Sequence, residues 1–265
     1  MDNLRRPQLS GRTVVVTGGT RGVGAGIAQA FAEAGAEVVA CARRPPEVPV
    51  EGVEFAPLDL RDPPAVRTFF AGLPRLDVLV NNAGGGPYRL LSEAEAERHA
   101  RVLELNLLAP LTASLAAYEH LRRAQGAVVM IGSVSGSRPS PGSAAYGAAK
   151  AGLESLARSM AVEWAPEVRV NTLVVGMVRT ELAHLHYGGE DGIEAVARTV
   201  PLGRLATPAD VGAAAVFLAS DAAAYISGAS LLVHGGGERP AFLDAATANK
   251  DTRDGRTREM GGDVR

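Results

Sequence analysis

The sequence predicts an α/β fold: a single, doubly wound domain in which helices cover both faces of a mostly parallel, seven-stranded sheet. Seven short apolar runs, rich in β-branched residues, alternate with longer alanine-rich segments of helical periodicity. The short runs are apolar throughout rather than alternately apolar and polar, which indicates strands buried on both faces. No shift in composition and no internal repeat of about 20–50 residues divides the chain, so we expect one domain.

The elements follow one another as strand, helix, strand, an order that requires right-handed crossovers between parallel strands. The predicted strands are residues 13–17, 37–42, 53–58, 78–81, 127–133, 169–175 and 229–233. The predicted helices are residues 24–34, 63–71, 93–124, 144–164 and 208–220. Together these elements place the domain over residues 1–237.

Three segments are interpreted separately. Residues 180–205 form an insertion before the last helix, and two interpretations remain open: a mobile lid over a cleft, or a surface excursion. Residues 238–265 are charged and dotted with glycine, which indicates a tail. The charged stretch 93–101, which includes Arg98 and Arg101, is interpreted as a solvated helix face.

Composition excludes several classes of protein. The 265 residues carry a formal net charge of −2, which does not favour a nucleic-acid or acidic-membrane partner. The single cysteine, Cys41, excludes an internal disulfide framework and a thiolate zinc cluster, and the histidines show no metal-binding spacing. No apolar run is long enough to cross a membrane and no secretory signal is recognisable, so we expect a cytoplasmic protein.

A glycine-rich segment follows the first predicted strand and opens a helix. Glycines permit a tight turn and let backbone N–H groups approach a pyrophosphate, while the helix N-terminus adds partial positive charge. In this strand–turn–helix context the segment predicts a dinucleotide site of the Rossmann type. Its candidate cofactor-binding residues are Gly18, Thr20, Arg21, Gly22, Val23 and Gly24.

The order of five motifs resembles the short-chain dehydrogenase/reductase family. The glycine segment has the spacing T-G-x-x-x-G-x-G, and it is followed by Asn81-Asn82-Ala83-Gly84, Asn106, Ser133 and Tyr146-x-x-x-Lys150. Each motif is modest alone, but the set in this order is specific. The resemblance runs through nearly all of residues 10–236.

The residue after the second strand favours NADP(H) as the cofactor. A free 2′-hydroxyl favours a carboxylate at this place, whereas a 2′-phosphate favours arginine. Ala42 stands where NAD-preferring relatives carry Asp, and Arg43 stands where NADP-preferring relatives carry Arg. Arg21 is a second basic residue typical of NADP-type members. The alternative that Arg43 is only a solvated loop charge remains open.

The resemblance implies further cofactor contacts after the third, fourth and sixth strands. Near the adenine and its ribose it places Asp59, Leu60, Asn82, Ala83 and Gly84. Near the nicotinamide it places Gly176, Val178 and Thr180. Two positions depart from the family's usual residues: Val175 replaces a proline that shapes the turn, and His234 replaces an aspartate.

Tyr146 and Lys150 lie four residues apart, so a helix brings them onto one face. Tyrosine, with an ordinary pKa near 10, is a poor acid–base group at neutral pH, and a nearby ammonium favours the phenolate and lowers that pKa. Only two of the 27 basic residues are lysines, and one of them stands here. By the resemblance, Ser133 holds the substrate oxygen, and the backbone carbonyl of Asn106 holds a water against Lys150.

The sequence therefore predicts an NADP(H)-dependent oxidoreductase that acts on a small carbonyl or alcohol substrate, with Tyr146 as acid and base. The run Pro201-Leu202-Gly203-Arg204 is similar to bacterial 3-oxoacyl-thioester reductases, and the family implies a homotetramer. Two alternatives remain: a non-catalytic NADP-binding sensor, which typically loses the Tyr or Lys, and a nucleotide-sugar epimerase, which usually has a second domain.

Overall fold

The computed structural model describes residues 9–246, and within this range seven strands form one sheet in which all neighbours are parallel. The strands are β1 (Thr13–Thr17), β2 (Glu37–Ala42), β3 (Val53–Pro57), β4 (Val78–Asn81), β5 (Ala127–Ser133), β6 (Arg169–Val175) and β7 (Ser230–Val233). Their spatial order is β3-β2-β1-β4-β5-β6-β7. The direction of winding reverses between β1 and β4, where open α/β sheets bind ligands. The predicted fold class is confirmed.

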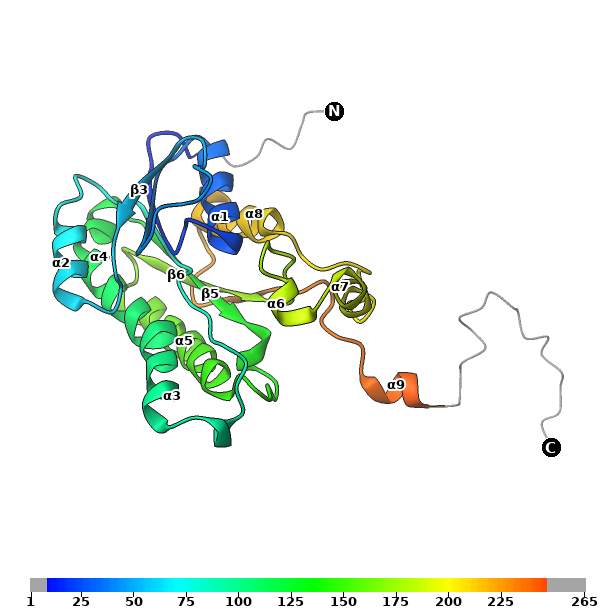
Figure 1. The fold of residues 1–265 in the computed structure, drawn as a ribbon. Helices are drawn as coiled ribbons and strands as arrows, with labels where there is room; N and C mark the ends of the chain where they lie inside the picture. Colours follow the sequence, from blue (N-terminus) through cyan, green and yellow to red (C-terminus); the bar gives the residue numbers. More distant parts are fainter. Residues whose placement is uncertain (1–8, 247–265) are drawn as a thin grey trace, which may run out of the picture.

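Helices cover both faces of the sheet (Figure 1). One face carries α1 (Gly22–Glu33) and α8 (Pro208–Ala219); the other carries α2 (Pro63–Ala71), α4 (Ala109–Ala124) and α5 (Ala144–Glu163). Successive residues of β1 enter different cores: Val14 and Val16 pack on the side of α1, and Val15 packs on the side of α4. Because both faces are covered, the strand is apolar throughout.

The predicted helix over residues 93–124 is found from Ala96 onward, but it starts three residues late and contains a π-helical turn. A 3₁₀ turn, η1 (Leu91–Glu93), precedes α3 (Ala96–Leu103), and a π-helical turn, η2 (Glu104–Leu108), joins α3 to α4. Pro110 has no N–H, so the carbonyl of Asn106 lacks the donor that an α-helix supplies four residues later. Apolar periodicity does not reveal a single wider turn, and such turns are frequent at functional sites.

The inserted segment and the chain end form smaller elements. Residues 180–205 contain α6 (His184–Tyr187) and α7 (Glu190–Ala197), which share a small apolar core of their own. Two further 3₁₀ turns are η3 (Val134–Gly136) and η4 (Asp221–Ala223). Beyond β7, α9 (Ala241–Ala245) extends away from the sheet (Figure 1). Residues 247–265 of the predicted tail lie outside the described residues. Between residues 9 and 246, no helix is long and apolar enough to cross a membrane.

Glycines allow α1 and α8 to pack closely. A Cβ added at Gly212 would lie 2.7 Å from both the Cβ of Ala30 and the carbonyl oxygen of Gly26. Neither atom moves without shifting α1, so Gly212→Ala should lower the free energy of unfolding by about 1–3 kcal/mol despite alanine's better helix propensity. Urea denaturation measures this change.

Gly189→Ala is the matched control for this substitution. A Cβ at Gly189 meets no atom within 4 Å, and its φ of −67° is ordinary for alanine. The free energy of unfolding should change by no more than about 0.5 kcal/mol. Equal losses in the two variants would contradict the role assigned to the helix crossing.

Candidate active site

The glycine segment forms a turn between β1 and α1, at the edge where the strand order reverses. Gly18 and Gly22 have positive φ angles of 63° and 53°, which other residues rarely adopt. A Cβ at Gly18 would lie 2.9 Å from the Cα of Ala83, and one at Gly24 would overlap the carbonyl oxygen of Gly18. The turn therefore requires glycine both for its dihedral angles and for its close approach to the segment after β4.

The N-terminus of α1 has no side-chain cap. Helices α2 and α8 begin with Asp62 and Thr207, whose side chains accept hydrogen bonds from first-turn N–H groups. Arg21 before α1 makes no such bond, and α5 and α7 also begin without a side-chain cap. The N–H groups at the start of α1 are therefore available to an anion. An uncapped helix behind a glycine turn fits the pyrophosphate of a dinucleotide. Thr20 is half-buried in this turn, and Val23 packs against the core.

Asn82 holds the glycine turn in place. Its Nδ2 donates to the carbonyl oxygens of Thr17 at 2.9 Å and Gly18 at 3.2 Å. The hydroxyl of Thr17 accepts from the backbone N–H groups of Asn82 and Ala83, both at 3.0 Å. This network joins the carboxyl ends of β1 and β4. The side-chain N–H groups of Asn82 therefore bind the protein's own backbone.

Two unpaired guanidinium groups lie near the ends of β1 and β2. Arg21 and Arg43 are exposed, and neither guanidinium has a hydrogen-bond partner within residues 9–246. Asp59, after β3, accepts side-chain hydrogen bonds from Arg61 at 2.7 and 3.0 Å. These bonds, with a smaller attraction from Arg43, lower the pKa of Asp59 to about 2. An adenine contact would therefore share this carboxylate with Arg61, while Leu60 is buried in the core.

Three of the predicted catalytic residues meet at the carboxyl end of β5. Ser133 ends β5, and Tyr146 and Lys150 stand one turn apart on α5. The Tyr146 hydroxyl interacts with the side chain of Ser133, whose Oγ accepts from the N–H of Ser135 at 3.2 Å. Lys150 Nζ donates to the carbonyl of Ile131 at 2.7 Å and lies 5.5 Å from the centroid of the Tyr146 ring. The phenol, the hydroxyl and the ammonium thus form one group.

Burial dominates the proton affinities of this group. Burial raises the pKa of Tyr146 by more than the hydrogen bond with Ser133 lowers it. Burial also lowers the pKa of Lys150 from 10.5 to about 8. In the protein alone, the expected lowering of the Tyr146 pKa is therefore not found, because the expectation counted the ammonium charge but not the loss of solvent. The direction found favours the protonated phenol, which is the form that donates to a carbonyl oxygen.

Asn106 is fully buried and clamps the segment after β4. Its Nδ2 donates to the carbonyls of Gly85 and Val102, both at 2.9 Å, and its Oδ1 accepts from the N–H of Gly85 at 2.8 Å. A Cβ at Gly84 would lie 2.5 Å from that Oδ1 and 3.4 Å from Lys150 Nζ. Asn106 is therefore a neighbour of Lys150, and its side chain is fully engaged in holding the backbone.

The predicted nicotinamide contacts follow β6. A Cβ at Gly176 would lie 2.8 Å from the Cβ of His234, so the two segments that depart from the family pattern touch here. Val178 pairs with the segment before α8 in a parallel bridge. Thr180 Cγ2 lies 3.6 Å from the place of a Cβ at Gly22, so the segment after β6 borders the glycine turn.

The inserted segment reaches the same region through Tyr187 of α6. Burial raises the pKa of Tyr187, and Arg138, Glu238 and Tyr146 each act on its hydroxyl through their charges. Arg138 and Glu238 themselves form an ion pair at 2.6 Å. Residues 180–205 therefore border the candidate site rather than a remote surface.

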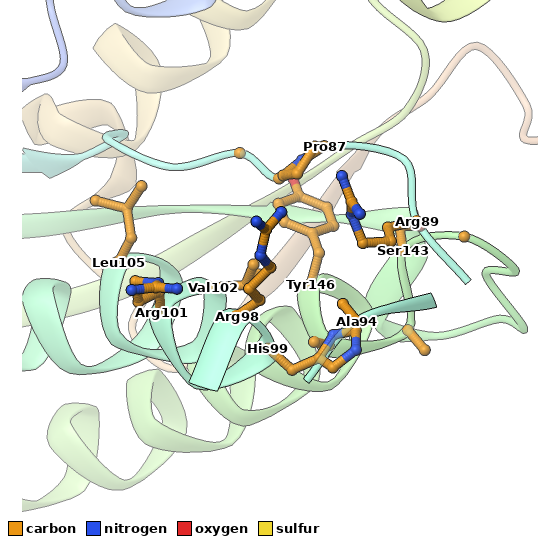
Figure 2. A pocket seen from close by; sticks show the side chains of 15 residues that line it. Pro87, Arg89, Ala94, Arg98, His99, Arg101, Val102, Leu105, Ser143 and Tyr146 are labelled. Atoms are coloured by element: carbon orange, nitrogen blue, oxygen red, sulfur yellow. The ribbon is translucent and has the colours of Figure 1, made fainter. Parts of the chain in front are cut away.

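A cavity of about 400 Å³ opens beside Tyr146 (Figure 2). Its walls are the segment after β4, helix α3 and the start of α5. Its three arginines, Arg89, Arg98 and Arg101, are not among the site residues expected from the sequence. Their signal is the spacing of Arg98, Arg101 and Val102 at positions i, i+3 and i+4, which places them on one face of a helix.

Comparisons with known proteins agree with this geometry. The chain matches a family model described as Enoyl-(Acyl carrier protein) reductase over residues 18–238. L-fucose dehydrogenase of Oryctolagus cuniculus is 38% identical over 246 residues, which cover 87% of this chain and 86% of that protein. The aldohexose dehydrogenase of Thermoplasma acidophilum, solved in ligand-free form, has a TM-score of 0.82 at 28% identity, covering 86% of this chain and 94% of that one.

A third similar protein was solved with a nucleotide. The putative NAD(P) dependent gluconate 5-dehydrogenase from Beutenbergia cavernae, with NADP bound at low occupancy, has a TM-score of 0.79 at 35% identity. The aligned residues cover 86% of this chain and 97% of that structure's chain. The family model spans most of the chain, and these dehydrogenases share its fold nearly from end to end. The order of motifs and the arrangement of the sheet therefore lead to one conclusion: this chain belongs to the short-chain dehydrogenase/reductase family, a family of oxidoreductases.

Proposed function

We propose that this protein uses NADP(H) to interconvert a carbonyl compound and a secondary alcohol, with Tyr146 as general acid and base. The observation that carries the proposal is the group formed by Ser133, Tyr146 and Lys150 beside the glycine turn and next to a cavity. The nicotinamide supplies or accepts the hydride when it is bound. The glycine turn, the start of α1 and Thr180 would hold the cofactor, and the ammonium of Lys150 would bind its ribose hydroxyls.

The proton follows a route through this chain's own residues. In reduction, Ser133 and Tyr146 donate hydrogen bonds to the carbonyl oxygen and stabilise the negative charge that develops there. Tyr146 then gives its proton to this oxygen, and the ammonium of Lys150 stabilises the phenolate. The carbonyl of Asn106, which has lost its α-helical donor to Pro110, holds a water through which the proton is replaced. In oxidation, Tyr146 accepts the proton from the alcohol.

A substrate panel tests the proposal. Ketones, aldoses and acyl thioesters, with the matching alcohols, are assayed in parallel with NADPH or NADP and with NADH or NAD by the absorbance of the reduced nicotinamide. We expect turnover with at least one class and a preference for the phosphorylated cofactor. Turnover with NADH alone would contradict the cofactor assignment. Failure of every class, combined with no binding of either cofactor, would contradict the proposal as a whole.

Arg43→Asp should shift the preference from NADPH toward NADH. The substitution replaces an unpaired guanidinium by a carboxylate, which repels a 2′-phosphate and accepts a hydrogen bond from a 2′-hydroxyl. We expect the ratio of kcat/KM for NADPH to that for NADH to fall about 100-fold or more. The substitution turns an attraction for the 2′-phosphate into a repulsion, and it adds a hydrogen bond to the 2′-hydroxyl. Steady-state kinetics with each cofactor measure this ratio.

Arg67→Asp makes the same change of charge at an exposed position of α2, away from the glycine turn. The cofactor ratio of this control should remain within about 3-fold of the wild type, because long-range charge effects are screened. If Arg43→Asp leaves the ratio at the wild-type value, Arg43 is only a solvated charge.

We also propose that the protein is a homotetramer and that residues 180–205 act as a lid. The small residues of α4 and α5 do not argue for assembly, because Ala113, Ala117 and Ala157 are buried in the core of their own subunit. The support comes from apolar side chains that face outward on the same helices, Leu115 at 60% exposure and Val162 at 80%. Sedimentation as a monomer would contradict the tetramer.

A further inference from the structure

The cavity beside Tyr146 has an apolar floor and a cationic rim. Pro87, Val102 and Leu105 contribute aliphatic surface, together with Ala94, Ala144 and Ala145. Its volume of about 400 Å³ lies in the range of small-molecule sites. Tyr146 belongs to its wall, so a molecule in this cavity touches the residue that carries the proton.

Three guanidinium groups line the cavity: Arg89 from the loop after β4, and Arg98 and Arg101 from α3. Figure 2 shows Arg89 and Arg98 on either side of the Tyr146 ring. Within residues 9–246, the guanidinium groups of Arg98 and Arg101 have no hydrogen-bond partner, and Arg89 has only the backbone carbonyl of Glu93, at 3.5 Å. The described lining includes no aspartate or glutamate. The positive charge of this rim is therefore not neutralised by the cavity itself.

The carboxylates of α3 lie beside the cavity-facing side chains but do not line the cavity. Arg98, Arg101 and Val102 follow one another at i, i+3 and i+4 and share the face toward the cavity. Glu97 stands four residues before Arg101 and Glu104 three residues after it, so both are its neighbours along the helix, but neither lines the cavity and, within residues 9–246, neither forms an ion pair with Arg101. One face of the helix thus offers cations and aliphatic surface together.

We propose that this cavity binds an anionic group of the substrate, a carboxylate or a phosphate monoester, through Arg98 and Arg101. The proposal rests on the proposed function and specifies its substrate class: a carbonyl compound or alcohol whose reacting carbon lies at Tyr146 and whose short apolar spacer leads to an anion at the rim. Arginine suits this role because its planar fork donates two parallel hydrogen bonds to carboxylate or phosphate oxygens.

The test compares anionic substrates with neutral twins. The probes are 3-oxobutanoate and 5-oxohexanoate against their methyl esters, and dihydroxyacetone phosphate against dihydroxyacetone, which separates the carboxylate from the phosphate. We expect kcat/KM to favour at least one anion over its twin by about 10-fold or more, mainly through KM, because a charge-assisted hydrogen bond supplies binding. In Arg98→Gln and Arg101→Gln this preference should fall by about 10-fold, while the neutral twins stay within about 2-fold of the wild type. Arg67→Gln on α2 is the control and should keep the preference.

The outcomes separate this inference from the proposed function. Calorimetric titration of each pair into the Tyr146→Phe protein with NADP bound reports binding without turnover. The proposal is supported if the Tyr146→Phe protein binds an anion more tightly than its neutral twin and the double variant Tyr146→Phe with Arg98→Gln loses this preference. This result does not depend on turnover. No preference for any anion in binding and in kcat/KM, or equal losses for anion and neutral twin, would overturn it. The proposed function is tested separately, by turnover of the neutral twins and of the wider substrate panel.

Discussion

Replacing Tyr146 by phenylalanine should lower kcat/KM for carbonyl reduction by about 10²- to 10⁴-fold, the range that a lost proton donor costs. The substitution removes the oxygen that interacts with Ser133 and leaves the ring in place beside Lys150. Because the shape of the site is kept, binding of NADPH should change little. Steady-state kinetics with the best substrate of the panel measure the first quantity, and fluorescence titration measures the second.

Tyr225→Phe is the matched control, because it removes the same oxygen from a fully exposed side chain. Its kcat/KM should stay within about 2-fold of the wild type, as is usual for surface substitutions. Turnover by the Tyr146 variant at the wild-type rate would exclude Tyr146 as the acid and base.

Lys150→Met should abolish turnover and yet stabilise the protein without cofactor. Burial holds the pKa of Lys150 at about 8 in the fold, so the charged form costs about 3 kcal/mol at neutral pH relative to the unfolded chain. Methionine fills a similar volume with no charge, although it leaves the carbonyl of Ile131 without its donor, which costs about 1–2 kcal/mol. The net gain in the free energy of unfolding should be about 1–2 kcal/mol at pH 7, measured by urea denaturation.

The pH dependence of this gain follows from linkage. Between the folded pKa of about 8 and the ordinary value of 10.5, the unfolded chain binds more protons at Lys150 than the fold does. Raising the pH through this window therefore stabilises the wild type and leaves the methionine variant unaffected at this position. The advantage of the variant should be largest below pH 8 and should shrink toward pH 10. A variant that is less stable than the wild type at pH 7 would contradict the cost assigned to the buried ammonium.

Strand positions were predictable because the sheet is covered on both faces. In such a sheet apolarity starts and stops with the strand itself, and β1, β2, β4, β5 and β6 have the bounds expected from sequence. The glycine turn was also predictable from local sequence. Gly18 and Gly22 have positive φ angles, which residues other than glycine rarely adopt.

Features that depend on contacts across the fold were not predictable in the same way. The π turn before α4 coincides with a missing donor at Pro110 and with the side-chain bonds of Asn106 to Gly85, a segment more than 20 residues away in sequence. The pairing of Asp59 with Arg61 and the raised pKa of Tyr146 depend on side-chain rotamers and on burial. Arg98 and Arg101 are exposed, as expected for a solvated helix face, but periodicity shows only that residues share a face and not that this face borders a cavity.

The order of motifs along the chain determined the fold class, the family and the residues that meet at the site, because each motif states a local requirement: a turn, a buried strand, a pair of side chains one helical turn apart. Tertiary structure alone decided the proton affinities of Tyr146 and Lys150 and the cationic rim beside them. The proton affinities are set by exclusion of water, and the rim is set by which segments lie side by side. Neither is encoded in the spacing of residues along one element.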